Sequence, residues 1–221
     1  MSALKRVTVL ISGRGSNLKA LIERQNSYQV THVVSDKQNA GGLKFAHDAG
    51  IPVTVVERSS YLSLQDFKTG ILSAVKESAP DIVALAGFMV VLPNEFIEAF
   101  NGQLLNIHPS LLPMFPGLDT HQRALHAKVN HHGCTVHYVD AGIDTGPLIA
   151  QIKVPVFASD TSDTLAARVI EQEHNLYPLI VQLVALGYIT LRGRGVHFNS
   201  TAKVAATELG CSIFSNGGRD D

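Results

Sequence analysis

An amide and an imidazole stand two residues apart in LLNIHPSLLP, residues 104–113. The two leucines are typical of a buried strand, and Pro109 ends regular structure directly after His108. Side chains at positions i and i+2 of a strand point to the same side, so Asn106 and His108 can converge on one small object. The pair fits an active site, but a structural histidine bonded to backbone is the alternative.

A second stretch, AGIDTGP at 141–147, supplies a single carboxylate, Asp144, in a turn-rich loop. Gly142 and Gly146 allow this loop to approach another group closely. A carboxylate that reaches His108 raises the pKa of the imidazole and fixes its tautomer. Taken alone, Asp144 reads as an ordinary turn residue.

Amide, imidazole and carboxylate together suit attack by an amine on a carbonyl carbon. Asn106 and His108 would hold the developing oxyanion, while Asp144 keeps His108 charged and accepts the amine proton through water. Ser110 lies near, but its sequence context is not a nucleophile elbow. We therefore expect direct transfer rather than an acyl-enzyme.

SGRGSN, residues 12–17, follows an apolar strand and opens a helical pattern. Gly13 and Gly15 permit a tight turn, and the free N–H groups of a first helical turn suit a phosphate. Leu18 breaks the dinucleotide fingerprint, and the Lys-Ser/Thr of a P-loop is missing. A simple turn between strand and helix remains the alternative.

The stretch AGFMVVLP, residues 86–93, is apolar and follows a predicted strand. Taken alone, it is expected to belong to the hydrophobic core.

Short β-branched runs alternate with helical patterns in the first half of the chain. The expected strands cover 7–12, 30–35, 53–56, 81–87 and 104–107, and the expected helices cover 16–25, 41–49, 61–78 and a short segment from Pro93. This rhythm predicts an α/β fold, a Rossmann-like, mostly parallel sheet with helices on both faces. Ligands of such sheets bind beyond the carboxyl ends of the strands. Three stretches are expected there: residues 12–17 after the first strand, 87–92 after the fourth and 106–113 after the fifth.

The second half predicts antiparallel strands at 133–140 and 147–156, then a long helix over about 161–186. The remainder, 193–221, is weakly patterned, and 215–221 is expected to fray. We expect one domain over 1–221, with a phosphate-binding half at about 1–100 and a catalytic half at about 101–190.

Composition narrows the class of protein. The 221 residues are 45% hydrophobic with a net charge of -1, and Lys and Arg do not cluster, so no nucleic-acid partner is expected. Membrane-length apolar runs and an export signal are not found, so a cytoplasmic protein is expected. Two cysteines and ten histidines show no metal-ligand spacing, so no metal is expected.

The whole pattern closely resembles the folate-dependent phosphoribosylglycinamide formyltransferases. The resemblance runs from about residue 7 to about 190, through VLISGRGSNL, DIVALAGFMVVL, LLNIHPSLLPMFPGLDTHQRAL, HGCTVHYVDAGIDTGPLIAQ and ARVIEQEHNLYP. It implies transfer of a formyl group from 10-formyltetrahydrofolate to the glycinamide amine of a ribonucleotide in purine synthesis.

The resemblance also implies roles for individual residues. Asn106, His108 and Asp144 are catalytic. Gly15, Ser16 and Asn17 hold the substrate phosphate, and Glu173 contacts its ribose. The folate pterin lies against the backbone of Met89, Val90, Val91 and Leu92 and against the loop Asp140, Ala141, Gly142 and Ile143.

Some positions depart from the family pattern. Relatives often carry a cationic residue where this chain has Leu64, Val90 and Met114. Loss of these charges is expected to weaken the binding of an anionic folate tail. Another formyl-folate enzyme, such as formyltetrahydrofolate hydrolase or methionyl-tRNA formyltransferase, is the nearest alternative, and a non-catalytic nucleotide-binding module is a second. A monomer or a homodimer fits the resemblance.

Overall fold

The computed structural model describes residues 3–215. Contacts divide the chain into two compact units, Met1–Leu105 and Asn106–Asp221. The single domain expected over 1–221 stays a prediction, and each unit is described by itself.

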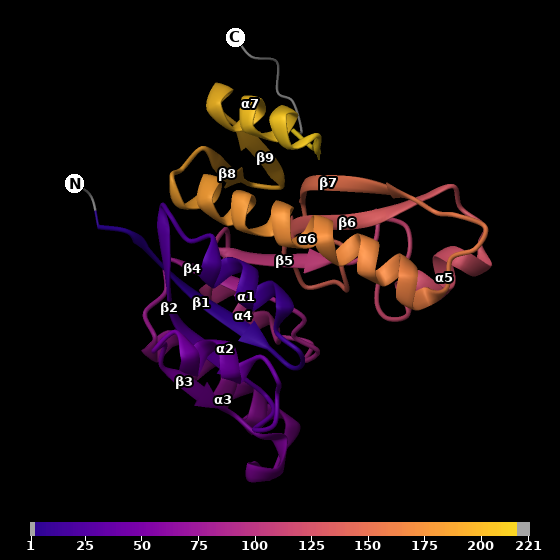
Figure 1. Cartoon of the computed structure of the whole chain (residues 1–221). Coiled ribbons are helices and arrows are strands. Elements are labelled where there is room, and N and C mark those ends of the chain that lie inside the picture. Colours follow the sequence, from indigo (N-terminus) through magenta and orange to yellow (C-terminus); the bar gives the residue numbers. More distant parts are fainter. Residues whose placement is uncertain (1–2, 216–221) are drawn as a thin grey trace. The chain divides into compact units, whose positions relative to one another are not determined.

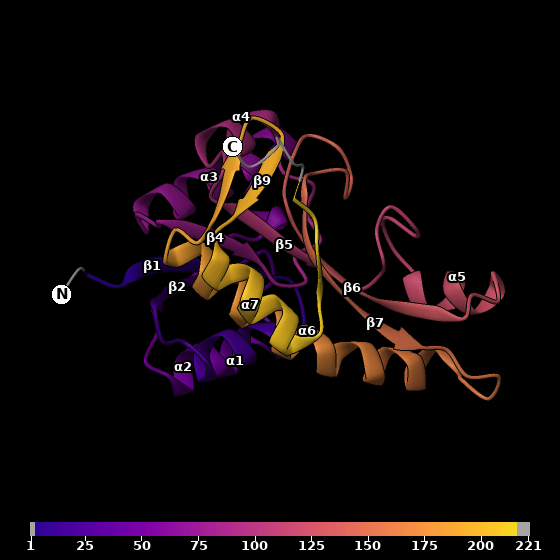
Figure 2. The ribbon, with the colours of Figure 1, turned by 90° about the horizontal axis from the view of Figure 1, so that it is seen from above.

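The first unit is a parallel sheet with the strand order β4-β1-β2-β3 (Figure 1). Its strands are β1 (Lys5–Ile11), β2 (Tyr28–Ser35), β3 (Val53–Val55) and β4 (Ile82–Leu85). Helices α1 (Ser16–Glu23) and α2 (Leu43–Asp48) cover one face, and α3 (Leu64–Glu77) and α4 (Asn94–Ala99) cover the other (Figure 2). Because both faces are covered, β4 is buried along its whole length and reads as a continuous apolar run. The predicted parallel sheet is confirmed.

Helix boundaries in this unit follow from capping. The helix expected from 61 begins only at Leu64, because the Ser63 side chain accepts a hydrogen bond from the Asp66 N–H and caps it. Residues Arg58–Ser60 form a separate 3₁₀ turn, η1. Pro93 has extended backbone and is the N-cap of α4, so the helix begins at Asn94, one residue later than predicted.

The second unit contains the antiparallel pair that the sequence predicts. Strands β6 (His131–Tyr138) and β7 (Leu148–Pro155) pair from His131 opposite Pro155, and β10 (Ser212–Ile213) adds to β7. Strand β5 (Leu104–His108) is the other neighbour of β6. Helix α6 (Ser162–Ala185) packs on β6 and β7 and begins at a capping box between Thr161 and Thr164.

Five elements of this unit were not expected, one of which is β10. Helix α5 (Thr120–His126) lies in the stretch between β5 and β6. A hairpin of β8 (Ile189–Arg192) and β9 (Gly195–Phe198) and a helix α7 (Ser200–Leu209) occupy the tail. The weakly patterned stretch from 193 thus contains regular structure that its sequence pattern did not predict. The fraying predicted for 215–221 concerns residues that, apart from Ser215, lie outside the described part.

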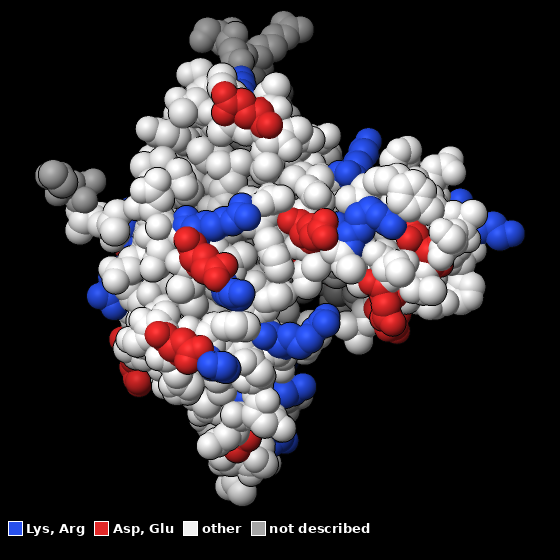
Figure 3. All heavy atoms as spheres, viewed as in Figure 1, with Lys and Arg blue, Asp and Glu red and all other residues white. Residues whose placement is uncertain are grey.

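No helix in the described residues is long and apolar enough to cross a membrane. On the face shown in Figure 3, Lys and Arg side chains are interspersed with Asp and Glu side chains. This mixture agrees with a net charge of -1.

Candidate active site

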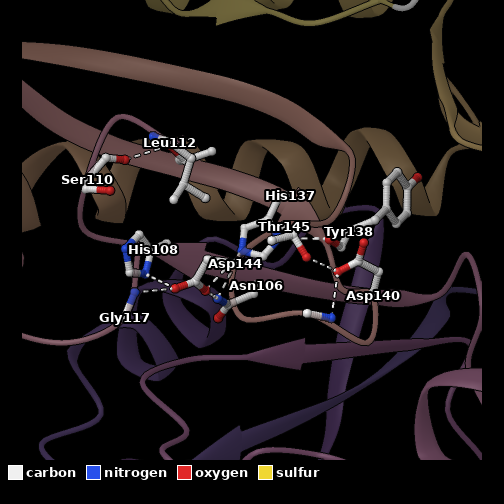
Figure 4. Close-up of polar contacts among 12 residues, drawn as sticks. Asn106, His108, Ser110, Leu112, Gly117, His137, Tyr138, Asp140, Asp144 and Thr145 are labelled. Atoms are coloured by element: carbon white, nitrogen blue, oxygen red, sulfur yellow. Dashed lines mark hydrogen bonds and ion pairs between the residues drawn. The ribbon is translucent and has the colours of Figure 1, made fainter. Parts of the chain in front are cut away.

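The end of β5 brings Asn106 and His108 to the same carboxylate, that of Asp144 (Figure 4). His108 Nδ1 lies 3.3 Å from Asp144 Oδ2, and Asn106 Nδ2 lies 3.5 Å from Asp144 Oδ1. The i, i+2 spacing of β5 therefore places both side chains on one side, as predicted. In this structure they converge on the protein's own carboxylate.

His137, which sequence reasoning did not single out, completes this cluster from β6. Its Nε2 lies 3.1 Å from Asn106 Nδ2, and its Nδ1 lies 2.8 Å from the carbonyl oxygen of Tyr138. A carbonyl oxygen only accepts, so Nδ1 of His137 carries the proton and Nε2 accepts from the Asn106 amide. His137 thereby fixes which way the Asn106 amide points. The histidine is inside a buried strand, where no local pattern marks it.

The expectation that His108 is held charged needs correction. His108 is 6% exposed, and this burial lowers the pKa of the imidazole below 6.5. The Phe115 carbonyl and the Asp144 charge act in the raising direction, as predicted for Asp144, but burial outweighs them.

The hydrogen bonds of His108 define where its proton is. Nε2 lies 3.0 Å from the carbonyl oxygen of Phe115, which only accepts, so Nε2 carries a proton. Nδ1 is then the position beside Asp144 at which a second proton binds. The pair is built to receive a proton at Nδ1 and to stabilise it there with the carboxylate.

Asp144 is held in an uncommon backbone conformation. Its φ is 55°, in the left-handed region that non-glycine residues seldom adopt. The Gly117 N–H donates to Oδ2 over 2.8 Å, and His137 Nε2 lies 3.7 Å from Oδ1. Burial alone would raise the pKa of Asp144, but these groups and the His108 imidazole hold it below 3.8. Asp144 therefore remains ionised at neutral pH.

A buried polar network fixes the loop after β5 that carries Phe115 and Gly117. The Thr135 hydroxyl donates to the Ser110 carbonyl over 2.6 Å and accepts from the Leu112 N–H and from Gln151. The Ser110 hydroxyl donates to the Met114 carbonyl over 2.6 Å. Ser110 is fully buried and its hydroxyl is engaged with backbone, in agreement with an anchoring rather than a nucleophilic role.

The first unit holds the predicted phosphate loop. Gly15 has a φ of 72° and precedes α1, and a Cβ placed on it would lie 2.4 Å from the Gly42 Cα. Only glycine therefore fits this turn without a backbone shift. The Ser12 hydroxyl accepts a hydrogen bond of 2.9 Å from the Met89 N–H, so the loops that follow β1 and β4 are joined.

The segment Met89–Leu92 is irregular backbone after β4. Met89 is 59% exposed and Val91 is 60% exposed, whereas Leu92 is buried. The core interpretation of this stretch is therefore wrong for Met89 and Val91. Exposed apolar side chains that lie close together are typical of a ligand-contacting surface.

Comparison with known proteins decides the family. A family model described as formyl transferase matches residues 5–181. The chain belongs to the formyl transferase family. A phosphoribosylglycinamide formyltransferase of Escherichia coli is 43% identical over 189 residues, covering 84% of this chain and 89% of that protein.

Further relatives agree with this assignment. A crystal structure of glycinamide ribonucleotide transformylase 1 from Symbiobacterium toebii has a TM-score of 0.85 at 39% identity, covering 88% of this chain and 94% of that one. The human trifunctional purine biosynthetic protein adenosine-3 is 45% identical over 86% of this chain. This formyl transferase spans only 19% of the length of that protein.

Ser16 and Asn17 are the first two residues of α1, and further predicted residues of the formyl transferase are in the second unit. Ala141, Gly142 and Ile143 are exposed on the loop before Asp144, as a ligand-contacting loop requires. Glu173 lies on α6 and is 6% exposed, and its charge acts with burial to raise the pKa of the Cys134 thiol on β6. A carboxylate this buried is held by specific partners.

Proposed function

We propose that this formyl transferase moves the formyl group of 10-formyltetrahydrofolate to the amine of 5-phosphoribosylglycinamide. The convergence of Asn106, His108 and Asp144 carries the proposal, because it joins an amide donor, a proton site and a carboxylate (Figure 4). The names of relatives that the chain matches over most of their length support it.

The proposed chemistry uses the cosubstrate only as the source of the formyl carbon. Asn106 Nδ2 has a contact of 3.5 Å with Asp144, at the outer limit of a hydrogen bond, so a formyl oxygen can replace this contact at little cost. The other contact of that amide, to His137, keeps its orientation fixed meanwhile. Asn106 then stabilises the negative charge that develops on the formyl oxygen.

Asp144 and His108 handle the proton. As the amine attacks, it loses a proton, and the ionised Asp144 accepts it directly or through water. The adjacent Nδ1 of His108 can take up that proton while Nε2 stays bonded to Phe115. As the bond between the formyl carbon and the folate nitrogen breaks, His108 returns this proton to the leaving nitrogen, and tetrahydrofolate and the formylated amine are the products.

Substrate binding is proposed by residue. Gly15, Ser16 and Asn17 bind the phosphate at the N-terminal end of α1, where the helix dipole favours an anion. Glu173 binds the ribose. Backbone of Met89, Val90, Val91 and Leu92, and of Asp140, Ala141, Gly142 and Ile143, binds the pterin. These assignments are tested separately by measuring the Kd of the ribonucleotide and of the folate for variants of each group of residues.

The decisive experiment measures formyl transfer by the wild type and by Asp144→Asn. We expect turnover by the wild type and a fall of about 100-fold or more in kcat for the variant. Asp163→Asn, an exposed aspartate in the first turn of α6, is the matched control and should keep wild-type activity. Folate deformylation without a formylated ribonucleotide would favour a hydrolase instead.

We also propose that the protein is a monomer or a homodimer and that it is cytoplasmic. Analytical ultracentrifugation tests the first prediction, and cell fractionation tests the second.

A further inference from the structure

The loop that carries Asp144 is closed by the side chain of Asp140. Oδ1 of Asp140 accepts hydrogen bonds from the Gly142 N–H over 3.1 Å and from the Thr145 hydroxyl over 2.7 Å (Figure 4). One carboxylate oxygen therefore joins the start of the loop to the residue directly after Asp144. Asp144 is therefore part of the chain segment that these bonds close, and its carboxylate is directed toward His108 and Gly117.

Steric fit in this loop leaves little freedom. A Cβ on Gly142 would lie 2.0 Å from the Thr145 hydroxyl oxygen, and a Cβ on Gly146 would lie 1.9 Å from the Tyr138 carbonyl oxygen. Asp144 keeps a φ of 55° within this packing. Such a conformation costs on the order of 1 kcal/mol or more and persists only where neighbouring contacts determine it. The position of Asp144 thus depends on the contacts of Asp140 and Thr145.

The second carboxylate oxygen of Asp140 points to the C-terminal hairpin. Arg194, in the turn between β8 and β9, places Nη2 3.3 Å from Asp140 Oδ2. The same arginine shares a small cavity with the chain that follows Asp144, lined by Thr145, Gly146, Pro147, Leu148, Arg194 and Phe214. The hairpin is thereby in contact with the catalytic loop.

We propose that Asp140 is a positioning residue for Asp144, and that Arg194 of the C-terminal hairpin holds Asp140 in place. This inference rests on the proposed function, which gives Asp144 its role. It also sharpens the role of Asp140 in cosubstrate binding. The Asp140 carboxylate is engaged within the protein, so Asp140 offers its backbone rather than its side chain to a folate.

The two residues should differ in how much they matter. The Arg194 side chain is 83% exposed, so its ion pair is screened by solvent and salt. Asp140 also makes the two bonds that close the loop. Loss of Asp140 should therefore disturb Asp144 far more than loss of Arg194 does.

The first experiment measures kcat and KM for formyl transfer in four variants. We expect kcat to fall about 10- to 100-fold in Asp140→Ala, because a displaced catalytic group loses its alignment. Asp140→Asn keeps an acceptor for Gly142 and Thr145 but loses the ion pair, so its kcat should fall only about 2- to 5-fold. Arg194→Ala loses the same ion pair, and its kcat should fall by about the same factor. Arg192→Ala, an exposed arginine on the same hairpin, is the matched control and should keep wild-type kcat.

A double variant distinguishes coupling from two separate effects. If Arg194 acts through Asp140, Arg194→Ala should have no further effect in an Asp140→Ala background. Added salt should also shrink the difference between wild type and Arg194→Ala. Equal kcat values for Arg194→Ala and Arg192→Ala would remove Arg194 from the proposal.

The second experiment does not depend on turnover. The His108 imidazole is titrated by NMR in wild type, Asp140→Ala and Asp144→Asn. Asp144, His137 and Arg123 act on this ring, and the His121 and His132 rings interact with it as well, so all five groups are kept unchanged in the three proteins apart from Asp144 in its own variant. A displaced Asp144 no longer supports the proton on Nδ1, so the His108 pKa in Asp140→Ala should shift down toward its value in Asp144→Asn.

The outcomes separate the two proposals. A shifted His108 titration together with no formyl transfer by the wild type supports positioning by Asp140 and rejects the proposed function. An unshifted titration in a folded Asp140→Ala protein overturns the positioning role. Should Asp140→Ala fail to fold, the same titration is made on Thr145→Val, which removes the hydroxyl bond to Asp140 Oδ1, and an unshifted His108 pKa there overturns the positioning role.

Discussion

Nδ1 of His108 lies 3.3 Å from Oδ2 of Asp144, a contact drawn as a dashed line in Figure 4. The opposite ring nitrogen is committed to the Phe115 carbonyl, 3.0 Å away. A neutral His108 therefore presents its lone pair to a carboxylate, and a proton at Nδ1 turns this contact into an ion pair. The pKa of His108 therefore reports whether the ionised Asp144 carboxylate is in place beside Nδ1.

The first prediction follows from that contact. Burial lowers the pKa of His108 below 6.5, so the ring is mostly neutral at pH 7. In Asp144→Asn the stabilising charge is removed, and the pKa should fall further. NMR titration of the His108 ring measures both values. The interpretation fails if the wild type titrates at or below the pH found for the variant.

A second prediction concerns His137, whose Nε2 accepts from the Asn106 amide. His137→Phe keeps a ring in the strand but leaves the amide without this acceptor, so the amide is free to turn. We expect kcat to fall about 10-fold with little change in KM for either substrate, because alignment rather than binding is lost. Steady-state kinetics test this.

His131→Phe, at the exposed start of the same strand, is the matched control for His137→Phe and should keep wild-type kcat. His137→Gln restores an acceptor to this position and should recover part of the activity. A His137→Phe enzyme with normal kcat would show that the Asn106 amide needs no such support.

The parts of the site that the sequence predicts are those fixed by local geometry. Asn106 and His108 share one side because a strand has a period of two, and Gly15 stands where a turn needs a positive φ. His137 and Arg194 were missed because their partners are distant in sequence. Arg194, for example, meets Asp140 across 54 positions.

The tail shows the same division. Helix α7 had readable caps, since the Asn199 side chain accepts from the Ala202 N–H and Gly210 has a φ of 72°. The helix was not predicted because its apolar positions form only a weak helical pattern, with Ala202 and Ala206 as its buried residues. The neutral resting state of His108 could not be predicted either, because burial of the ring depends on the surrounding fold.

A third prediction uses Gly15 in the proposed phosphate loop. A Cβ there meets the Gly42 Cα at 2.4 Å and the φ is 72°. Gly15→Ala should therefore lower the free energy of unfolding by roughly 1–3 kcal/mol and raise KM for the ribonucleotide more than for the folate. Gly13→Ala is the matched control, since its Cβ would meet nothing within 4 Å. Chemical denaturation and steady-state kinetics measure the two effects, and equal behaviour of both variants would refute the argument.

The last prediction concerns stability in acid. His132 is 1% exposed on β6, and burial together with the His121 and His108 rings lowers its pKa to about 4, against the pull of the Pro109 carbonyl. His132 Nε2 lies 3.2 Å from His121 Nδ1, so protonation of both rings is disfavoured. An unfolded chain binds this proton near pH 6.5, well before the folded chain does.

The sign follows from linkage. Between pH 6.5 and about 4 the unfolded state holds more protons at His132, so stability is complete above this window and falls as the pH drops through it. The loss is at most about 3 kcal/mol. In His132→Gln this part of the pH dependence should vanish, whereas in His47→Gln, a variant of a histidine on α2, it should persist. Urea denaturation at pH 7, 6, 5 and 4 measures the slopes, and parallel curves for wild type and His132→Gln would exclude His132 as the source.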